Sequence, residues 1–421
     1  MLKILTSIFK TPDLKAKVLY ILGIFVIFRI VAAIPLSIID TERLQRFFSA
    51  NPLFGLLNVF TGSTMENFSL VMLGLGPYIT AVIIMQLMTM IFPKLKELYQ
   101  REGEAGRQRF SQYGRLLTIP LSALQGFSIL TLLHRQNIIA ALSPTEMVTS
   151  LILITAGTLF LMWLGELIST KGIGNGVSLL IFAGIVSGIP ASIQQTIATY
   201  NSSQLPQYFG FAAVAVVVVA AVVFISEATR RLPVSYARRI RGRRLLGGAS
   251  TYLPLKVNQA GVIPIIFALS ILLFPNLLAT FFAGSSIEWV SGTALALNRI
   301  FENRVFYDVA YFLLVFGFTY FYTQVTFDPK NIAENMQRSG GFIPGIRPGT
   351  ETALYIGKVL NRITLAGALF LGAIAVLPNI VGAAANIQTL QIGGTAVLIV
   401  VAVVLETVRQ LEAQLALRQY E

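Results

Sequence analysis

Residues 147–168 read MVTSLILITAGTLFLMWLGELI, and the only charged side chain among them is Glu166. An α-helix rises about 1.5 Å per residue, so about 20 mostly apolar residues cross the roughly 30 Å hydrocarbon layer of a membrane. The stretch has that length, and it is too long and too uniformly apolar for a strand of a transmembrane barrel. It therefore predicts a membrane-spanning helix.

The same criterion, applied outward from this stretch, finds spans on both sides of it. Together the predicted spans are 18–38, 68–92, 116–133, 147–168, 177–198, 209–225, 257–282, 305–327, 359–380 and 392–405. The last one is short and must borrow flanking residues. The sequence thus predicts an all-α polytopic membrane protein with ten transmembrane helices. Their division into five plus five suggests two pseudo-symmetric halves, although no residue-level repeat is visible.

The charge distribution gives these spans an orientation. Charged residues make up 12% of the chain, about half the usual share, and 32 Lys and Arg against 19 Asp and Glu leave a net charge of +13. Cytoplasmic loops of membrane proteins collect Lys and Arg. With ten spans, one side receives both termini and most of these residues, whereas the opposite side receives only Arg43, Arg46, Arg135, Arg299 and Arg304. Both termini are therefore predicted to be cytoplasmic.

These boundaries divide the chain into four parts. We expect a cytoplasmic N-terminus at 1–17, a first five-helix half at 18–198, a second half at 199–408 and a cytoplasmic tail at 409–421. The second half contains two cytoplasmic loops, 226–256 and 328–358. No cleavage-site pattern precedes the first apolar run, so that run is interpreted as a retained span.

Several kinds of chemistry are excluded by composition. The chain has no cysteine and a single histidine, His134, so disulfides, thiolate metal sites and cysteine nucleophiles are impossible. No P-loop occurs, and the glycine cluster KGIGNGVS at 171–178 is neither a P-loop nor a dinucleotide motif. The spans also lack the central acid or histidine typical of ion-driven carriers. We predict no catalytic, cofactor or metal site, and energy must come from outside the chain.

Arg29 is the only charge well inside a span. It is either a structural arginine, hydrogen-bonded to backbone carbonyls or an adjacent span, or a residue that takes part in substrate passage. Between the first two spans, the apolar patch Leu53–Phe60 is too short to cross the membrane. The patch is either an interfacial or capping helix or a re-entrant element, for which Gly55 and Gly62 would provide pliable ends.

Two loops carry arginines in unusual settings. The first loop contains Arg230, Arg231, Arg238, Arg239, Arg241, Arg243 and Arg244, more than orientation requires. Because the guanidinium group pairs with phosphates and carboxylates, anionic lipid, ribosomal RNA or an acidic protein surface are all candidate partners. In the second loop, Arg347 lies between the turn pairs Pro344-Gly345 and Pro348-Gly349, which favours a fixed contact point over a solvated charge.

Two pairs of isoleucines repeat one helical spacing. Ile79 and Ile83 lie four residues apart in the second span, and Ile181 and Ile185 do so in the fifth. Isoleucines in membrane helices usually face lipid or a neighbouring helix. If such residues converge, a ring of branched apolar side chains blocks ions and water by dewetting, yet yields to a bulky chain.

Six segments along the chain resemble the SecY family, the channel-forming subunit of the bacterial Sec protein translocase. They are GPYITAVIIMQL (76–87), EGEAGRQRFSQYGR (102–115), GIGNGVSLLIFAGIVSGIP (172–190), GRRLLGGASTYLPLKVNQAGVIPIIFA (242–268), SGGFIPGIRPG (339–349) and GGTAVLIVV (393–401). The segments are long, unrelated to one another and in the family's order, so the resemblance covers almost the whole chain.

The resemblance implies two pseudo-symmetric halves around a central pore that also opens sideways to lipid. It implies a pore constriction formed by Ile79, Ile83, Ile181, Ile185, Ile266 and Ile399. It implies a plug in the segment 53–64, with Phe54, Gly55, Leu56, Leu57, Val59, Phe60 and Thr61. A lateral gate would lie between the second and third spans and the seventh and eighth, with Gln86, Gln125 and Asn258. The docking surface for the motor ATPase SecA and the ribosome would contain Arg238, Arg239, Arg241, Arg243, Arg244 and Arg347.

The function expected from this resemblance is that of a protein-conducting channel subunit, not an enzyme, in the bacterial plasma membrane. It would translocate unfolded polypeptides and release transmembrane segments sideways. The implied partners are SecE and SecG subunits, SecA, the ribosome, signal peptides, substrate chains and anionic lipids; no cofactor is implied. The competing hypotheses are a small-solute secondary transporter and a scaffold or assembly factor.

Overall fold

The computed structural model describes most of the chain. The described residues are 11–36, 44, 61–62, 64–65, 67–100, 102–135, 138–139, 142–198, 205–236, 239–241, 244–246, 250–282, 287–385 and 393–419. Within them, each of the ten predicted spans overlaps one long helix. These helices are α2 (Pro12–Ala32), α5 (Gly76–Ile91), α7 (Gly103–Arg135), α8 (Pro144–Lys171), α9 (Gly176–Ala198), α10 (Leu205–Glu227), α11 (Ile263–Phe282), α13 (Arg304–Thr326), α15 (Thr350–Ala385) and α17 (Gly393–Gln419).

In the described part of the chain, shorter helices join the long ones: α6 (Pro93–Gln100), α12 (Glu288–Glu302) and α14 (Pro329–Arg338). Helix α6 bends away from α5 by 116°, and by length and composition the two together are either one broken span or a re-entrant element. By the same test, four further helical stretches in the described part of the chain are long and apolar enough to cross a membrane: 103–135, 144–171, 304–338 and 350–377. The remaining spans are shorter or more polar.

Two predicted spans begin well before the helix that they overlap. The second span was placed at 68–92, but α5 begins at Gly76, with Pro77 in its first turn. The residues before it form turns, because Phe68 and Gly74 have positive φ angles of 45° and 56°. The seventh span was placed at 257–282, but α11 begins at Ile263. Both preceding stretches are apolar, so hydropathy alone does not distinguish their turns from helix.

The loop 226–256 is a β-hairpin over much of its length. Strand β1 (Thr229–Tyr236) pairs antiparallel with β4 (Ser250–Lys256), and β5 (Gly341–Phe342) pairs with the other edge of β1. Farther along, β2 (Arg239–Arg241) pairs with β3 (Arg244–Leu246). The sheet β4-β1-β5 joins the loops 226–256 and 328–358. The sequence analysis described both segments as loops, and these strands correct that description, while the fold is mostly helical as predicted.

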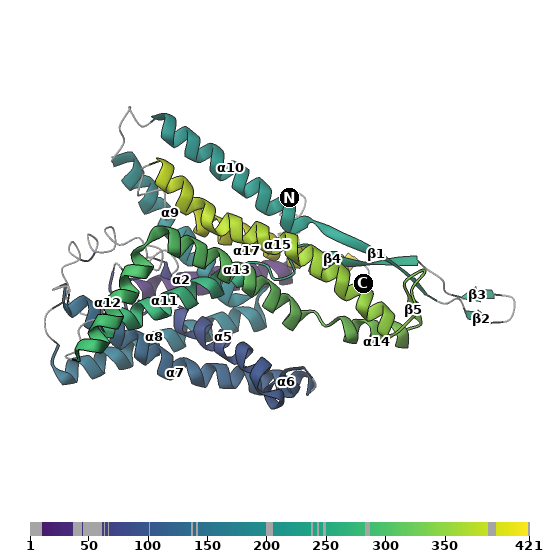
Figure 1. Ribbon diagram of the computed structural model, residues 1–421, viewed down its shortest axis with the longest axis horizontal. Helices are drawn as coiled ribbons and strands as arrows, with labels where there is room; N and C mark the ends of the chain where they lie inside the picture. The colour runs from purple at the N-terminus through teal and green to yellow at the C-terminus, as the bar shows by residue number, and fades with distance from the viewer. Residues whose placement is uncertain are drawn as a thin grey trace.

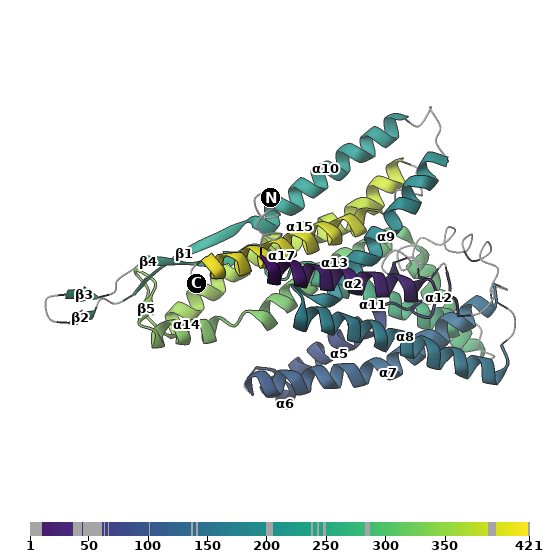
Figure 2. The same cartoon turned by 180° about the vertical axis from the view of Figure 1, so that it is seen from behind.

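The helices lie side by side, and the strands project from one end of the bundle (Figure 1). The start of α2 and the end of α17 lie near the strands. Arg409 Nε of α17 donates to Glu227 Oε1 at 2.9 Å, and Lys17 Nζ of α2 donates to Gln414 Oε1 of α17 at 3.4 Å. Helix α12 lies at the opposite end, as the view from behind also shows (Figure 2). The start of α2, the end of α17 and the sheet therefore share one side of the molecule.

Candidate functional site

The predicted constriction residues lie in one hydrophobic cluster. Five of the six isoleucines are buried members of this cluster, and the sixth, Ile79, is partly buried and packs against it. They come from α5, α9, α11 and α17, and α5 contacts α11 while α9 contacts α17. Helices from both halves of the chain thus bring these side chains into the same core. The buried members are Ile83, Ile181, Ile185, Ile266 and Ile399.

The segment 53–64 reaches this cluster at its C-terminal end. Phe54, Gly55, Leu56, Leu57, Val59 and Phe60 lie outside the described residues, whereas Thr61 is described and buried. The backbone of Gly62 lies against Gly184 of α9, so that a Cβ added to Gly62 would be 2.6 Å from the Gly184 Cα. Gly62 also has a φ of +78°, which side chains other than glycine adopt rarely. Two glycines therefore permit a direct backbone contact.

Gly184 lies between Ile181 and Ile185 on α9, so the contact is made beside two of the predicted constriction residues. The sequence analysis named Gly62 but missed Gly184. A signal was present, because a glycine between two inward-facing isoleucines of one helix leaves room for another backbone. The sequence around Gly184, however, does not indicate which backbone segment packs against it.

Arg29 takes the structural role among the two that its position allowed. Its Nη1 donates to the carbonyl oxygen of Gly62 at 3.1 Å. Beyond Gly62, the chain is held by Thr64, whose fully buried Oγ1 lies 3.0 Å from the Thr61 carbonyl oxygen and 3.2 Å from that of Val71. The end of the segment is therefore fixed by α2, by α9 and by the turns before α5.

Gln86 lies on α5 and Gln125 on α7, two helices that both contact α11, and Asn258 lies in the turn just before α11. Asn258 is buried, and its Nδ2 donates to the Gly261 carbonyl oxygen at 3.1 Å. The Asn258 Oδ1 and the Gln86 Oε1 are buried without a hydrogen-bond partner. Gln125 lies beside Gly76 at the start of α5. Within the described part of the chain, no hydrogen bond links any two of these three amides.

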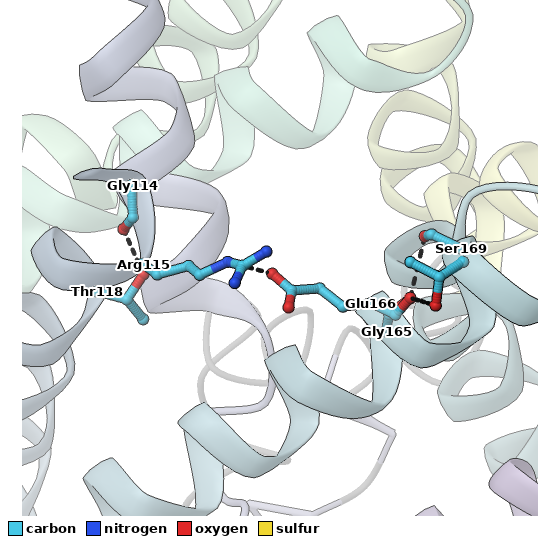
Figure 3. A network of polar contacts seen from close by, with 7 residues as sticks. Gly114, Arg115, Thr118, Gly165, Glu166 and Ser169 are labelled. Carbon is cyan, nitrogen blue, oxygen red and sulfur yellow. Dashed lines mark hydrogen bonds and ion pairs between the residues drawn. The ribbon is translucent and has the colours of Figure 1, made fainter. Parts of the chain in front are cut away.

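An ion pair joins α7 to α8. Arg115 Nε and Glu166 Oε1 are 2.5 Å apart, and Figure 3 shows their side chains pointing toward one another from the two helices. One turn farther along α8, Ser169 Oγ donates to the Gly165 carbonyl oxygen and accepts from the Gly176 backbone N–H at 2.9 Å. The ion pair and the serine together link three consecutive spans.

We expect Arg115 and Glu166 to be energetically coupled. Both side chains are partly exposed, at 43% and 24%, so solvent screening limits their coupling to about 1 kcal/mol or less. Arg115→Met should lower the midpoint of thermal unfolding in detergent more than the double variant with Glu166→Gln, because the single variant leaves a carboxylate without its cation. Additive effects of the two substitutions would contradict the coupling.

Arg347 is exposed in a rigid turn. Gly345 and Gly349 on either side have φ angles of +82° and +97°, and the Arg347 carbonyl oxygen accepts from Thr352 Oγ1 at 2.8 Å. Arg239 and Arg241 lie on β2, and Arg244 lies on β3 opposite Arg241. Arg238 and Arg243 fall outside the described residues. The sheet thus brings the two predicted docking loops together on one side of the molecule.

The described residues contain no group of three or more His, Cys, Asp or Glu side chains that could hold a metal ion. His134 Nδ1 lies 3.5 Å from the Ile139 carbonyl oxygen at the end of α7.

Comparison with known proteins decides the family. The family model SecY matches residues 69–408. This chain belongs to the SecY family. It is 44% identical over 442 residues to the protein translocase subunit SecY of Streptomyces galbus, covering 100% of this chain and 99% of that relative. As a SecY-family member, it is a multi-pass membrane protein and a protein-conducting channel subunit, not an enzyme.

Two solved SecY-type structures have the same fold at 20% sequence identity, each covering 94% of this chain and 91% of its own. One, entitled "The plug domain of the SecY protein stablizes the closed state of the translocation channel and maintains a membrane seal", superposes with a TM-score of 0.63. The other, the canine Sec61 in a ribosome-channel complex from the endoplasmic reticulum, superposes with a TM-score of 0.62. This chain therefore has the same fold as these two solved structures.

Proposed function

We propose that this SecY-family subunit is a passive, gated conduit for unfolded polypeptides, sealed at rest by its isoleucine cluster and by the segment 53–64. The observation that carries the proposal is the contact of Gly62 with Gly184, between two isoleucines of a cluster built from both halves of the chain. Branched apolar side chains exclude ions and water, yet they move aside around a peptide.

Sideways release follows from the helices that meet at the predicted gate. Separation of α5 and α7 from α11 would open a path from the pore to lipid. An apolar signal or transmembrane segment would leave by that path, because each Å² of apolar surface removed from water contributes about 25 cal/mol. Gln86 and Asn258 each present a buried acceptor without a partner in this region, and water or a passing chain would satisfy it when the helices separate.

The partners are proposed to bind on the side of the sheet. We place SecA and the ribosome at Arg347 and at the hairpin arginines, where guanidinium groups meet phosphates or carboxylates. The canine relative with the same fold is itself in a ribosome complex. SecE and SecG subunits and anionic lipids would surround the helices, and signal peptides and substrate chains would enter the pore.

The same side is proposed to be cytoplasmic in the bacterial plasma membrane. The positive-inside bias places the basic loops there. The contacts of Arg409 with Glu227 and of Lys17 with Gln414 support this orientation for both termini, because they join the chain ends to the start of the hairpin.

A cysteine at Ile79 should crosslink to a stalled translocating chain. The chain has no natural cysteine, so Ile79→Cys gives a single reactive thiol. Leu22→Cys, on a half-exposed face of α2, is the matched control and should react only with reagents dissolved in lipid. Labelling of Ile79→Cys by lipid reagents alone would reject the pore assignment. Solute uptake by purified protein without SecA or ribosomes would favour a secondary transporter instead.

A further inference from the structure

Helix α12 connects α11 to α13 at the end of the bundle opposite the strands (Figures 1 and 2). Its 15 residues extend about 22 Å, too short to cross a membrane. None of the predicted sites includes this helix, and it was not among the predicted spans. Its side chains nevertheless divide into three sectors rather than the two of an ordinary surface helix.

One sector fixes α12 to the protein. Ala294 is 3% exposed, and the Phe301 ring packs edge-on against Phe306 of α13, with 5.8 Å between the ring centroids. The helix also contacts α11 along its length. These contacts set the direction in which the other two sectors face.

The second sector is apolar and exposed. Trp289 is 74% exposed, Leu297 45% and Ile300 44%. Spacings of eight and three residues place the three side chains on one side of a helix with 3.6 residues per turn. Beside it, a third sector holds Glu288 and Arg299, which are three helical turns apart, together with the exposed Leu295. A helix that is exposed only to water rarely carries a contiguous exposed apolar sector, so this sector indicates contact with an apolar phase or a partner.

A second exposed apolar stripe follows on α13. The exposed stripe of α13 begins directly after α12 ends, with Val305 at 72%, Val309 at 53% and Leu313 at 59% exposed. These residues recur every four positions on a transmembrane helix, so their shared side faces the bilayer. Only Asn303, which caps α13 by accepting from the Val305 and Phe306 backbone N–H groups, separates the two helices.

We propose that α12 lies in the lipid headgroup region at this end of the molecule, with its apolar stripe in contact with phospholipid. The indole of Trp289 fits the boundary between headgroups and acyl chains, since its ring is apolar and its N–H is a donor. Glu288 and Arg299 then face the headgroups and water. This contact holds the connection between α11 and α13 at a defined depth. The proposal does not depend on the pore assignment, because it uses only the membrane location of the chain.

The two tryptophans of the chain make the contact measurable. Trp163→Phe leaves Trp289 as the only tryptophan, and Trp289→Phe leaves Trp163, which is 52% exposed on the span α8 and serves as the matched control. Each variant, checked for a single gel-filtration peak, is reconstituted into phosphatidylcholine vesicles brominated either near the headgroup or near the chain ends. Aqueous acrylamide is the third quencher.

We expect bromine near the headgroup to quench Trp289 fluorescence by about one half, and bromine near the chain ends to quench it less. Adding Leu297→Asp to the Trp163→Phe variant should weaken this quenching, because a carboxylate withdraws the stripe from lipid. The proposal is overturned if acrylamide, and not brominated lipid, quenches Trp289 while Trp163 responds to the lipid. It is also overturned if neither quencher reaches Trp289, since protein then covers the stripe.

Discussion

Vesicles that contain the Gly184→Val variant should leak ions at rest. An added Cβ at position 184 would lie 3.1 Å from the Gly62 Cα, and the two valine methyl groups extend farther, so the Gly62 backbone must leave α9. Overpacking of this kind costs about 1–3 kcal/mol, which shifts a closed-to-open equilibrium by about 5- to 150-fold. Ion flux from proteoliposomes, measured without SecA or substrate, gives the size of the effect.

The control is Gly23→Val on α2, where an added Cβ meets no atom within 4 Å. The control should leave the vesicles as tight as the native protein does. Arg29→Met tests the same seal without adding bulk, because it removes the hydrogen bond to the Gly62 carbonyl, and it should raise the leak by a smaller factor. If both Gly184→Val and Arg29→Met stay tight, the segment 53–64 is not the seal, and a scaffold without a pore becomes the better hypothesis.

Reversal of the charge at Arg347 should reduce SecA-driven export severely while the protein still inserts. Losing one partner of a hydrogen-bonded charge pair costs about 2 kcal/mol or more of binding free energy, so we expect export to fall by about thirtyfold at limiting SecA. Thr352 and the flanking glycines hold the backbone, and Arg347→Glu therefore alters the contact rather than the fold. Export into inverted membrane vesicles measures the loss.

Arg135→Glu at the end of α7 makes the same change in net charge at the far end of the molecule and should leave export unchanged. Arg347→Lys should recover part of the activity, because lysine keeps the charge but lacks the bidentate fork. Normal export by Arg347→Glu would exclude this residue from the docking surface.

The local sequence pattern predicted the transmembrane helices, but it did not predict the turns before α5 or the β1–β4 hairpin. A span is defined by length and hydropathy, and both are local, so each predicted interval overlaps a helix. The turns before α5 were missed because Phe68 and its neighbours are as apolar as a helix. The β1–β4 hairpin was not predicted, although Leu232 and Val234 alternate with exposed residues as in a half-buried strand.

In the candidate site, too, features that depend on neighbouring residues were predicted, and contacts between distant segments were not. The turn around Arg347 was predicted because its two Pro-Gly pairs act on their own backbone. The isoleucine positions came from family resemblance, and the helical spacing of two pairs supported them. The contact between Gly62 and Gly184 was not predictable, because it joins segments far apart in the sequence and depends on how closely two backbones approach. Arg29 had two interpretations, and only the position of the Gly62 carbonyl distinguished them.

The hairpin has a mechanical consequence. A small hydrophobic core joins the two basic loops, so they pack together as one unit. Its members include Leu232, Val234, Leu255, Met336 and Ile343. At its base, the Val257 backbone N–H donates to the Ala228 carbonyl oxygen at 2.9 Å, which ties the end of α10 to the approach to α11. If SecA or the ribosome binds the hairpin as proposed, a displacement of the hairpin is passed through this hydrogen bond directly to the residues that precede α11.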